Sequence, residues 1–183
     1  MDIEKGKVVH MEKTIADNLT IQRSLTRLTY EIIEKNKGIN NLILVGIKTR
    51  GEFLAKRIAD QMTKLEGAHV PVFAVDVSAY RDDRQNSEAS QLTNQISTNI
   101  DNQHIVLVDD VFYTGRTMRA AMDALMDMGR PQRISIAVLV DRGHREMPIR
   151  PDFVGKNIPT ANDEKVQVNL SEVDQHDQIN LIK

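Results

Sequence analysis

Short apolar runs alternate along the chain with longer stretches in which apolar positions recur every three or four residues. The runs are almost uninterrupted, which is typical of strands buried on both faces of a parallel sheet. They predict strands at 42–47, 72–77, 105–108 and 134–140, and shorter ones at 153–154 and 166–170. The stretches between them have the period of helices with one buried face.

Helical spacing is clearest in residues 17–38, where Asp17 can serve as the N-cap and Gly38 can end the helix. The apolar stripe of this helix consists of Ile21, Leu25, Leu28, Ile32 and Ile33. Residues 52–65 and 117–128 predict two further helices. This order predicts an α/β fold, with an open, mainly parallel sheet that is flanked by helices and binds ligands at the carboxyl ends of its strands.

Length and composition narrow the class of protein. With 183 residues and 40% apolar content, we expect a single domain over residues 1–183. The net charge is −2, so a nucleic-acid partner would need a local basic patch. The absence of cysteine excludes disulfides and thiolate metal sites. Because no stretch has the length of a membrane span or the pattern of a signal peptide, we expect a cytoplasmic protein with no membrane partner.

Residues 81–104 interrupt the pattern, because this stretch is polar and has almost no apolar period. A connection of this length inside a compact domain is usually functional or mobile. A linker between two domains is the alternative, but the predicted strands on both sides continue one sheet.

The stretch IVLVDDVFYTGRT, residues 105–117, carries the strongest chemical signal. Its loop, which opens the next helix, consists of Thr114, Gly115, Arg116 and Thr117. Such a loop offers backbone N–H groups, hydroxyls and the positive end of a helix dipole, which suit a phosphate. Asp109 and Asp110 would repel a phosphate, so they indicate vicinal hydroxyls, Mg²⁺ or both nearby. A phosphorylated sugar with a metal-bound diphosphate fits both the acidic pair and the loop. The alternative is that the acids merely close a strand and the glycine merely permits a turn, but such a structure would not require acids, threonines and glycine together.

A second anion loop follows the first buried strand and consists of Lys48, Thr49, Arg50 and Gly51. It opens a helix and contains two cations, which implies a second phosphate group. A basic turn at the surface is the alternative. The glycine and lysine pattern of nucleotide-binding P-loops is absent, which argues against a nucleoside triphosphatase.

Residues 105–117 resemble the phosphoribosyl diphosphate (PRPP) signature of the type I phosphoribosyltransferases. The resemblance extends to NNLILVGIKTRG at 40–51, AYRDD at 79–83 and AVLVDRGHREMPIRPDFVGKNIPT at 137–160, so it covers nearly the whole chain. Within that family, these stretches are similar to regulators of pyrimidine operons that are also uracil phosphoribosyltransferases.

The resemblance implies the type I phosphoribosyltransferase fold and the transfer of the phosphoribosyl group from PRPP to uracil, giving UMP and diphosphate, with Mg²⁺ as cofactor. Asp109 and Asp110 would act at the ribose hydroxyls and contribute to holding Mg²⁺, which binds mainly through the substrate. The loop 114–117 would hold the 5-phosphate. The loop 48–51, which often contains a non-proline cis peptide in this family, would hold the diphosphate.

A mobile catalytic hood is also implied, beginning with Tyr80, Arg81, Asp82 and Asp83. Arg81 would neutralise the departing diphosphate while the hood excludes water. We expect the base near residues 140–142 and 166–168.

The segment after residue 140 concentrates positive charge, which usually means a solvated surface. The resemblance to the regulators implies that this segment and the first helix form the face that binds the hairpin of an mRNA leader. UMP or UTP in the enzyme site could change that affinity by stabilising one conformation or assembly. The matching residues are Thr26, Arg27, Arg142, His144, Arg145, Arg150, Lys156 and Thr160. Tyr30 stands where that family often has a histidine, and it could still stack on a base.

The sequence leaves two interpretations: a regulator with uracil phosphoribosyltransferase activity, in which the site also senses nucleotides, or a plain uracil salvage enzyme that does not bind RNA. The resemblance implies a homo-oligomer, a dimer or higher, in either case. A phosphatase with an aspartyl nucleophile would need a D-x-D-x-T order, which DDVFYT at 109–114 does not supply.

Overall fold

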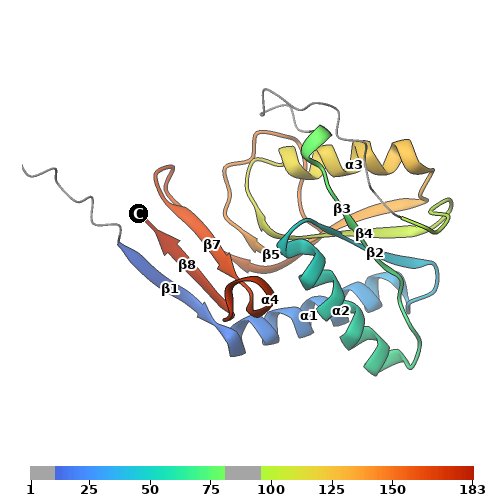
Figure 1. The fold of residues 1–183 in the computed structure, drawn as a ribbon, viewed down its shortest axis with the longest axis horizontal. Helices are drawn as coiled ribbons and strands as arrows, with labels where there is room; N and C mark the ends of the chain where they lie inside the picture. The colour runs from blue at the N-terminus through green and yellow to red at the C-terminus, as the bar shows by residue number, and fades with distance from the viewer. Residues whose placement is uncertain (1–10, 81–95) are drawn as a thin grey trace, which may run out of the picture.

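Five parallel strands form the central sheet of the computed structural model, which describes residues 11–80 and 96–183 (Figure 1). Their order in the sheet is β3-β2-β4-β5-β6. The strands are β2 (Leu42–Ile47), β3 (Val72–Val75), β4 (His104–Phe112), β5 (Arg133–Asp141) and β6 (Phe153–Asn157). The predicted parallel sheet is therefore confirmed. The central strand β4 is longer than predicted, because it continues past the apolar run and contains both aspartates.

Helices cover both faces of this sheet. The helices α1 (Asn18–Asn36) and α2 (Arg50–Glu66) lie on one face, and α3 (Arg116–Met128) lies on the other (Figure 1). The predicted N-cap is confirmed, because the carboxylate of Asp17 accepts a hydrogen bond of 2.9 Å from the N–H of Thr20. The C-cap of α1 is Lys37, which adopts the left-handed conformation one residue before the predicted Gly38.

A second, antiparallel sheet has the order β1-β8-β7 and lies at one end of the molecule (Figure 1). It is formed by β1 (Glu12–Asp17), β7 (Lys165–Asn169) and β8 (Gln178–Ile182), with the short helix α4 (Ser171–Asp174) between the last two. Only β7 was predicted, because polar residues conceal the alternation of apolar positions in β1 and β8. A single turn of 3-10 helix, η1 (Ser78–Tyr80), follows β3.

None of the helices in the described ranges is long and apolar enough to span a bilayer. This statement covers residues 11–80 and 96–183 alone.

The alternation of side chains along β4 separates two apolar layers. Val106 and Val108 pack with α1 and α2, whereas Ile105 and Leu107 pack with α3. The strict alternation ends after Val108, because Val111 packs with the layer of α1 and α2 and Phe112 with the layer of α3. The two acids lie at this irregular end of β4, at the carboxyl edge of the sheet.

Candidate active site

The acidic pair occupies the carboxyl end of β4. Asp109 is buried, and its Oδ1 accepts a hydrogen bond of 2.9 Å from the N–H of Asp110. Asp110 in turn accepts a bond of 2.8 Å from the N–H of Val111. Burial raises the pKa of Asp110, and its bonds with Asp109 and Val111 and the positive charge of Arg50 partly offset that effect. The pair is therefore a fixed set of oxygen acceptors next to a cation.

The loop between β4 and α3 has the geometry of an anion site. Gly115 is the N-cap of α3 with a φ of 91°, a conformation that L-residues with side chains rarely adopt. The N–H of Arg116 donates to the hydroxyl of Thr114 at 3.3 Å, while the guanidinium of Arg116 reaches Glu146 at 2.9 Å. The side chain of Arg116 is thus engaged outside the loop, and the loop presents the start of α3 and the two threonines.

The loop 48–51 lies directly beside β4. A Cβ atom on Gly51 would come within 2.3 Å of the carbonyl oxygen of Val108 and 3.1 Å of the Cα of Asp109, so only glycine permits this approach. The expected cis peptide is present between Lys48 and Thr49. Lys48 and Thr49 are exposed. The structure thus brings together the two predicted anion loops, which lie far apart in the sequence, and we call them and the acidic pair the phosphate edge.

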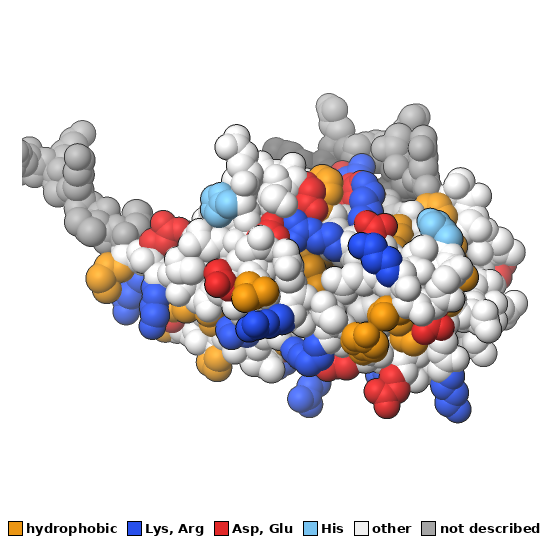
Figure 2. Space-filling model, turned by 90° about the horizontal axis from the view of Figure 1, so that it is seen from below, with side chains coloured by type: hydrophobic (Ala, Val, Ile, Leu, Met, Phe, Trp, Pro, Cys, Tyr) orange, Lys and Arg blue, Asp and Glu red, His pale blue; other side chains and the backbone are white. Residues whose placement is uncertain are grey.

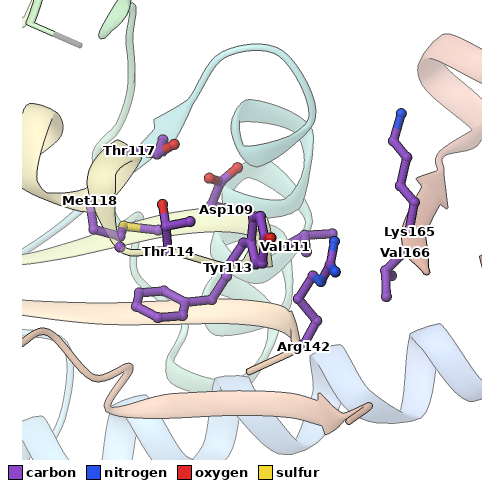
Figure 3. Close-up of a pocket in the computed structure, with 11 residues that line it drawn as sticks. Asp109, Val111, Tyr113, Thr114, Thr117, Met118, Arg142, Lys165 and Val166 are labelled. Carbon is purple, nitrogen blue, oxygen red and sulfur yellow. The ribbon is translucent and has the colours of Figure 1, made fainter. Parts of the chain in front are cut away.

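A cavity of about 250 Å³ opens at the phosphate edge. Figure 3 shows Thr114 and Thr117 on one side of Asp109, and Arg142, Lys165 and Val166 on the other. The predicted base region near 140–142 and 166–168 is thus represented in the wall by Arg142 and Val166. Tyr113 and Lys165 also line the cavity and were not predicted. Lys165 has no local signal because it comes from the small antiparallel sheet.

Arg142 is buried, unlike a surface cation. Its guanidinium carbon lies 4.0 Å from the centre of the Tyr113 ring. Its Nε donates to the hydroxyl of Thr160 at 3.1 Å, and its Nη2 donates to the carbonyl of Glu164 at 2.7 Å. These contacts hold Arg142 in the wall of the cavity, beside Thr160, which is also one of the predicted RNA residues.

The remaining predicted RNA residues lie on two elements, α1 and the segment after β5. His144, Arg145 and Arg150 are exposed, and they line a shallow groove of about 450 Å³ together with Arg142 and Thr160. The imidazole Nε2 of His144 lies 2.6 Å from the carbonyl oxygen of Thr160. Arg145 forms an ion pair with Asp141. We call the exposed residues Thr26, Arg27, His144, Arg145, Arg150 and the half-buried Lys156 the basic segment.

Arg27 connects α1 with β6. Its guanidinium lies 2.7 Å from the carboxylate of Glu31 and donates to the carbonyls of Val154 at 3.0 Å and Gly155 at 2.6 Å. Arg27 therefore places Thr26, its neighbour on α1, close to the strand that carries Lys156. In Figure 2, which shows the side on which α1 and α2 lie, basic and acidic side chains are interspersed.

The expected hood falls largely outside the described residues, because these exclude Arg81, Asp82 and Asp83. Tyr80 is described: its hydroxyl donates to Asp127 of α3 at 2.7 Å, and Arg119 donates to its carbonyl at 3.1 Å. The hydrogen bond to Asp127 raises the pKa of Tyr80. These bonds fasten the end of η1 to α3, and the role of Arg81 stays a prediction.

Comparisons with known proteins agree with this geometry. The family model of the phosphoribosyl transferase domain matches residues 11–175. Among solved structures, the hypoxanthine phosphoribosyltransferase of Trypanosoma cruzi has a TM-score of 0.74 at 18% identity, over 93% of this chain and 95% of the other. A Staphylococcus aureus hypoxanthine phosphoribosyltransferase has a TM-score of 0.71 at 21% identity, over 93% and 92%. At these identities the structures establish the fold. The chain belongs to the phosphoribosyltransferase family.

Curated relatives show to which group of the phosphoribosyltransferase family the chain is most similar. It is 59% identical to the Bifunctional protein PyrR of Limosilactobacillus reuteri, over 93% of this chain and 98% of that protein. It is likewise 59% identical to the Bifunctional protein PyrR of Ligilactobacillus salivarius, over 94% of this chain and 99% of that protein. Within the family, the chain therefore groups with the PyrR proteins.

Proposed function

We propose that this protein transfers the 5-phosphoribosyl group from PRPP to uracil, forming UMP and diphosphate, and that it regulates pyrimidine operons by binding an mRNA leader. The observation that carries the enzyme activity is the contact of Gly51 with β4 at Val108 and Asp109. This contact joins two anion sites and an acidic pair at one edge of the sheet. PRPP has the matching groups, a phosphate and a diphosphate on the two sides of a ribose diol.

Each part of the phosphate edge has a role toward PRPP. The backbone N–H groups at the start of α3, with the hydroxyls of Thr114 and Thr117, bind the 5-phosphate. Asp109 and Asp110 accept hydrogen bonds from the ribose hydroxyls and stabilise the positive charge that develops on the sugar as the C1–O bond breaks. The loop 48–51 binds the departing diphosphate through its backbone and its two cations.

Carboxylate oxygens are also the ligands that Mg²⁺ prefers, so the donor set of Asp109 and Asp110 fits this ion. Two carboxylates leave most of its coordination positions to oxygens of the substrate and to water. When bound, Mg²⁺ would neutralise charge on the diphosphate and lower the barrier to its departure.

The cavity wall beyond Asp109 suits the base. Tyr113 and Arg142 form one side of the cavity and Lys165 and Val166 the other, and the uracil ring would lie between them. The contact of Arg142 with Tyr113 fixes the shape of this side. Recognition of uracil by main-chain groups would leave no motif for the base pocket in the sequence.

The basic segment supports RNA binding at a second surface. Its cations Arg27, Arg145 and Arg150 lie outside the phosphate edge. Arg27 and Arg145 form ion pairs within the protein, but their side chains are still 50% and 37% exposed, so all three can contact the phosphates of a hairpin. The effect of a nucleotide can reach this surface through Arg142, which lines both the cavity and the groove of His144 and Arg150. UMP or UTP in the cavity would therefore alter the affinity for RNA. As the family resemblance implies, the active form would be a homo-oligomer.

Titration calorimetry tests both activities. We expect PRPP with Mg²⁺, and separately UMP, to bind the wild-type protein, and UMP to increase its affinity for a pyrimidine leader hairpin. A protein that converts uracil and PRPP to UMP but does not bind the hairpin with or without UMP is a salvage enzyme alone. A protein that binds neither PRPP nor UMP contradicts the assignment of the phosphate edge.

A further inference from the structure

The diphosphate loop is attached to a distant acidic side chain. Arg50 follows Thr49 at the start of α2, and its guanidinium holds both carboxylate oxygens of Asp174. The bonds run from Nη2 to Oδ1 at 2.8 Å and to Oδ2 at 3.0 Å, and from Nε to Oδ2 at 3.2 Å. This two-pronged geometry is the most directional that an arginine and a carboxylate can form.

Asp174 is itself fixed by its own element. It is the last residue of α4, and its Oδ2 accepts a hydrogen bond of 2.9 Å from the N–H of Leu170, which is buried. The guanidinium of Arg50 and this N–H both lower the pKa of Asp174, so it is ionised at neutral pH. The carboxylate that holds Arg50 is therefore charged and oriented by the backbone.

The attachment leaves part of Arg50 available. A guanidinium has five N–H donors, and Asp174 takes the edge formed by Nε and Nη2. The Nη1 group is not engaged by Asp174 and can serve a second acceptor. Gly51, the residue after Arg50, lies directly against Val108 and Asp109 of β4. Arg50 therefore lies between α4 and the strand of the acidic pair, where the diphosphate of PRPP would bind.

From this geometry we infer that Asp174 is a positioning residue for the leaving group, which holds Arg50 in the orientation that binds diphosphate. The inference rests on the proposed function, because it names a residue that acts through the diphosphate loop. A free arginine side chain would lose rotamer freedom on binding diphosphate, whereas Asp174 restricts that freedom before the ligand arrives. The small antiparallel sheet, which carries α4, thus contributes to a site on the parallel sheet.

The chain offers a matched control on the same helix. Arg57 of α2 forms ion pairs with Glu172 of α4 and with Asp177 at 2.6 Å. These pairs join α2 to α4 as the pair of Arg50 and Asp174 does, but Arg57 lies about two turns further along α2. Loss of Glu172 would therefore weaken the same junction without changing Arg50.

Calorimetry with inorganic diphosphate and Mg²⁺ tests the inference on the full-length protein. We expect Asp174→Asn to weaken diphosphate binding about tenfold, and to have no further effect in an Arg50→Ala background, as for two residues that act as a unit. UMP binding should change by less than about twofold, and Glu172→Gln should match the wild type. Asp174→Glu, which keeps the charge, should recover part of the affinity.

Two results would overturn the inference while the proposed function stands. The first is normal diphosphate binding by Asp174→Asn when binding by Arg50→Ala is impaired. The second is tighter diphosphate binding by Asp174→Asn, which would mean that Asp174 competes with diphosphate for Arg50. An equal loss in Glu172→Gln would reduce Asp174 to a structural contact and would also overturn it. Normal binding by Arg50→Ala would instead contradict the diphosphate role of the loop. Because the amide oxygen that Asp174→Asn introduces can still accept the bond from the Leu170 N–H, the fold should be retained, and thermal unfolding checks this.

Discussion

The phosphate edge and the basic segment differ in how their polar groups are held. At the phosphate edge, Gly115 and Gly51 shape main-chain loops, and the donors are N–H groups at the starts of helices. In the segment after β5, side chains named from sequence as cations are already bonded: Arg142 to Thr160 and Glu164, and Arg145 to Asp141. A cluster of cations in a sequence is therefore not equivalent to a cluster of available cations.

The largest effect should come from the acidic pair. We expect Asp109→Asn combined with Asp110→Asn to lower uracil-dependent UMP formation by about a thousandfold or more, because the variant loses the charge that stabilises the developing sugar cation. The assay follows conversion of labelled uracil, and thermal unfolding confirms that the protein is folded. Hairpin binding measured without nucleotide should be unchanged. Near-normal turnover would show that the phosphate edge is misassigned.

The second comparison sets Arg142 against Arg150. Arg142→Ala removes the contact with Tyr113 and two hydrogen bonds in the cavity wall, so kcat/KM for uracil should fall about 10- to 100-fold. Arg150→Ala changes an exposed residue, so transfer should continue at the wild-type rate while hairpin binding weakens. Steady-state kinetics and gel shifts measure the two activities. If both variants lose only RNA binding, Arg142 belongs with the basic segment after all.

The third prediction concerns His104 at the start of β4, at the end of the sheet opposite to the phosphate edge, where no ligand role is proposed. His104 is buried, with Nδ1 2.7 Å from Asn36 Oδ1 and Nε2 3.0 Å from the hydroxyl of Ser135. The amide of Asn36 donates to the carbonyls of Gly38 and Asn40, so its oxygen faces Nδ1–H and Nε2 is left as an acceptor for Ser135. Burial first, and then the charge of Arg133, lower the pKa of His104 to about 4, with a smaller lowering from Lys35 and an opposing effect of Asp152.

Because the folded protein disfavours the charged imidazole, the unfolded chain binds more protons between about pH 6.5 and pH 4. Stability should therefore be complete above pH 6.5 and should decrease as the pH falls, by about 2 kcal/mol between pH 7 and pH 5. Urea unfolding of wild type and His104→Asn measures this slope. The variant should lack this part of the pH dependence, and equal slopes would contradict a buried, neutral His104.

The smallest effect is expected from a single cation of the basic segment. Lys156→Ala should weaken hairpin binding by about 1 kcal/mol and make the salt slope shallower by about one unit, as for one lost phosphate contact. Transfer of the phosphoribosyl group should be unaffected. Lys64→Ala, an exposed lysine on α2, is the control and should leave both quantities unchanged. A change of turnover in Lys156→Ala would mean that the two regions are less separate than the structure indicates.

The sequence by itself determined the parts of this protein that local physics controls. The strands β2, β4 and β5 were predicted because full burial leaves unbroken apolar runs, and α1 to α3 because one buried face leaves a period of 3.6 residues. The loops 48–51 and 114–117 could be located because each combines the end of a strand, a turn and the start of a helix in one short stretch, a pattern that favours an anion site.

The tertiary structure alone decided what depends on residues far apart in the chain. It brought Lys165 to the cavity of Asp109, attached Arg50 to Asp174, and buried Arg142 among partners that follow it by about twenty residues. It also formed the second sheet by pairing β1 with β8, which lie at opposite ends of the described chain. Ion pairs and hydrogen bonds between distant residues leave neither a periodic pattern nor a distinctive local composition in the sequence. Which cations are available to ligands is therefore set by packing, and residue type alone does not reveal it.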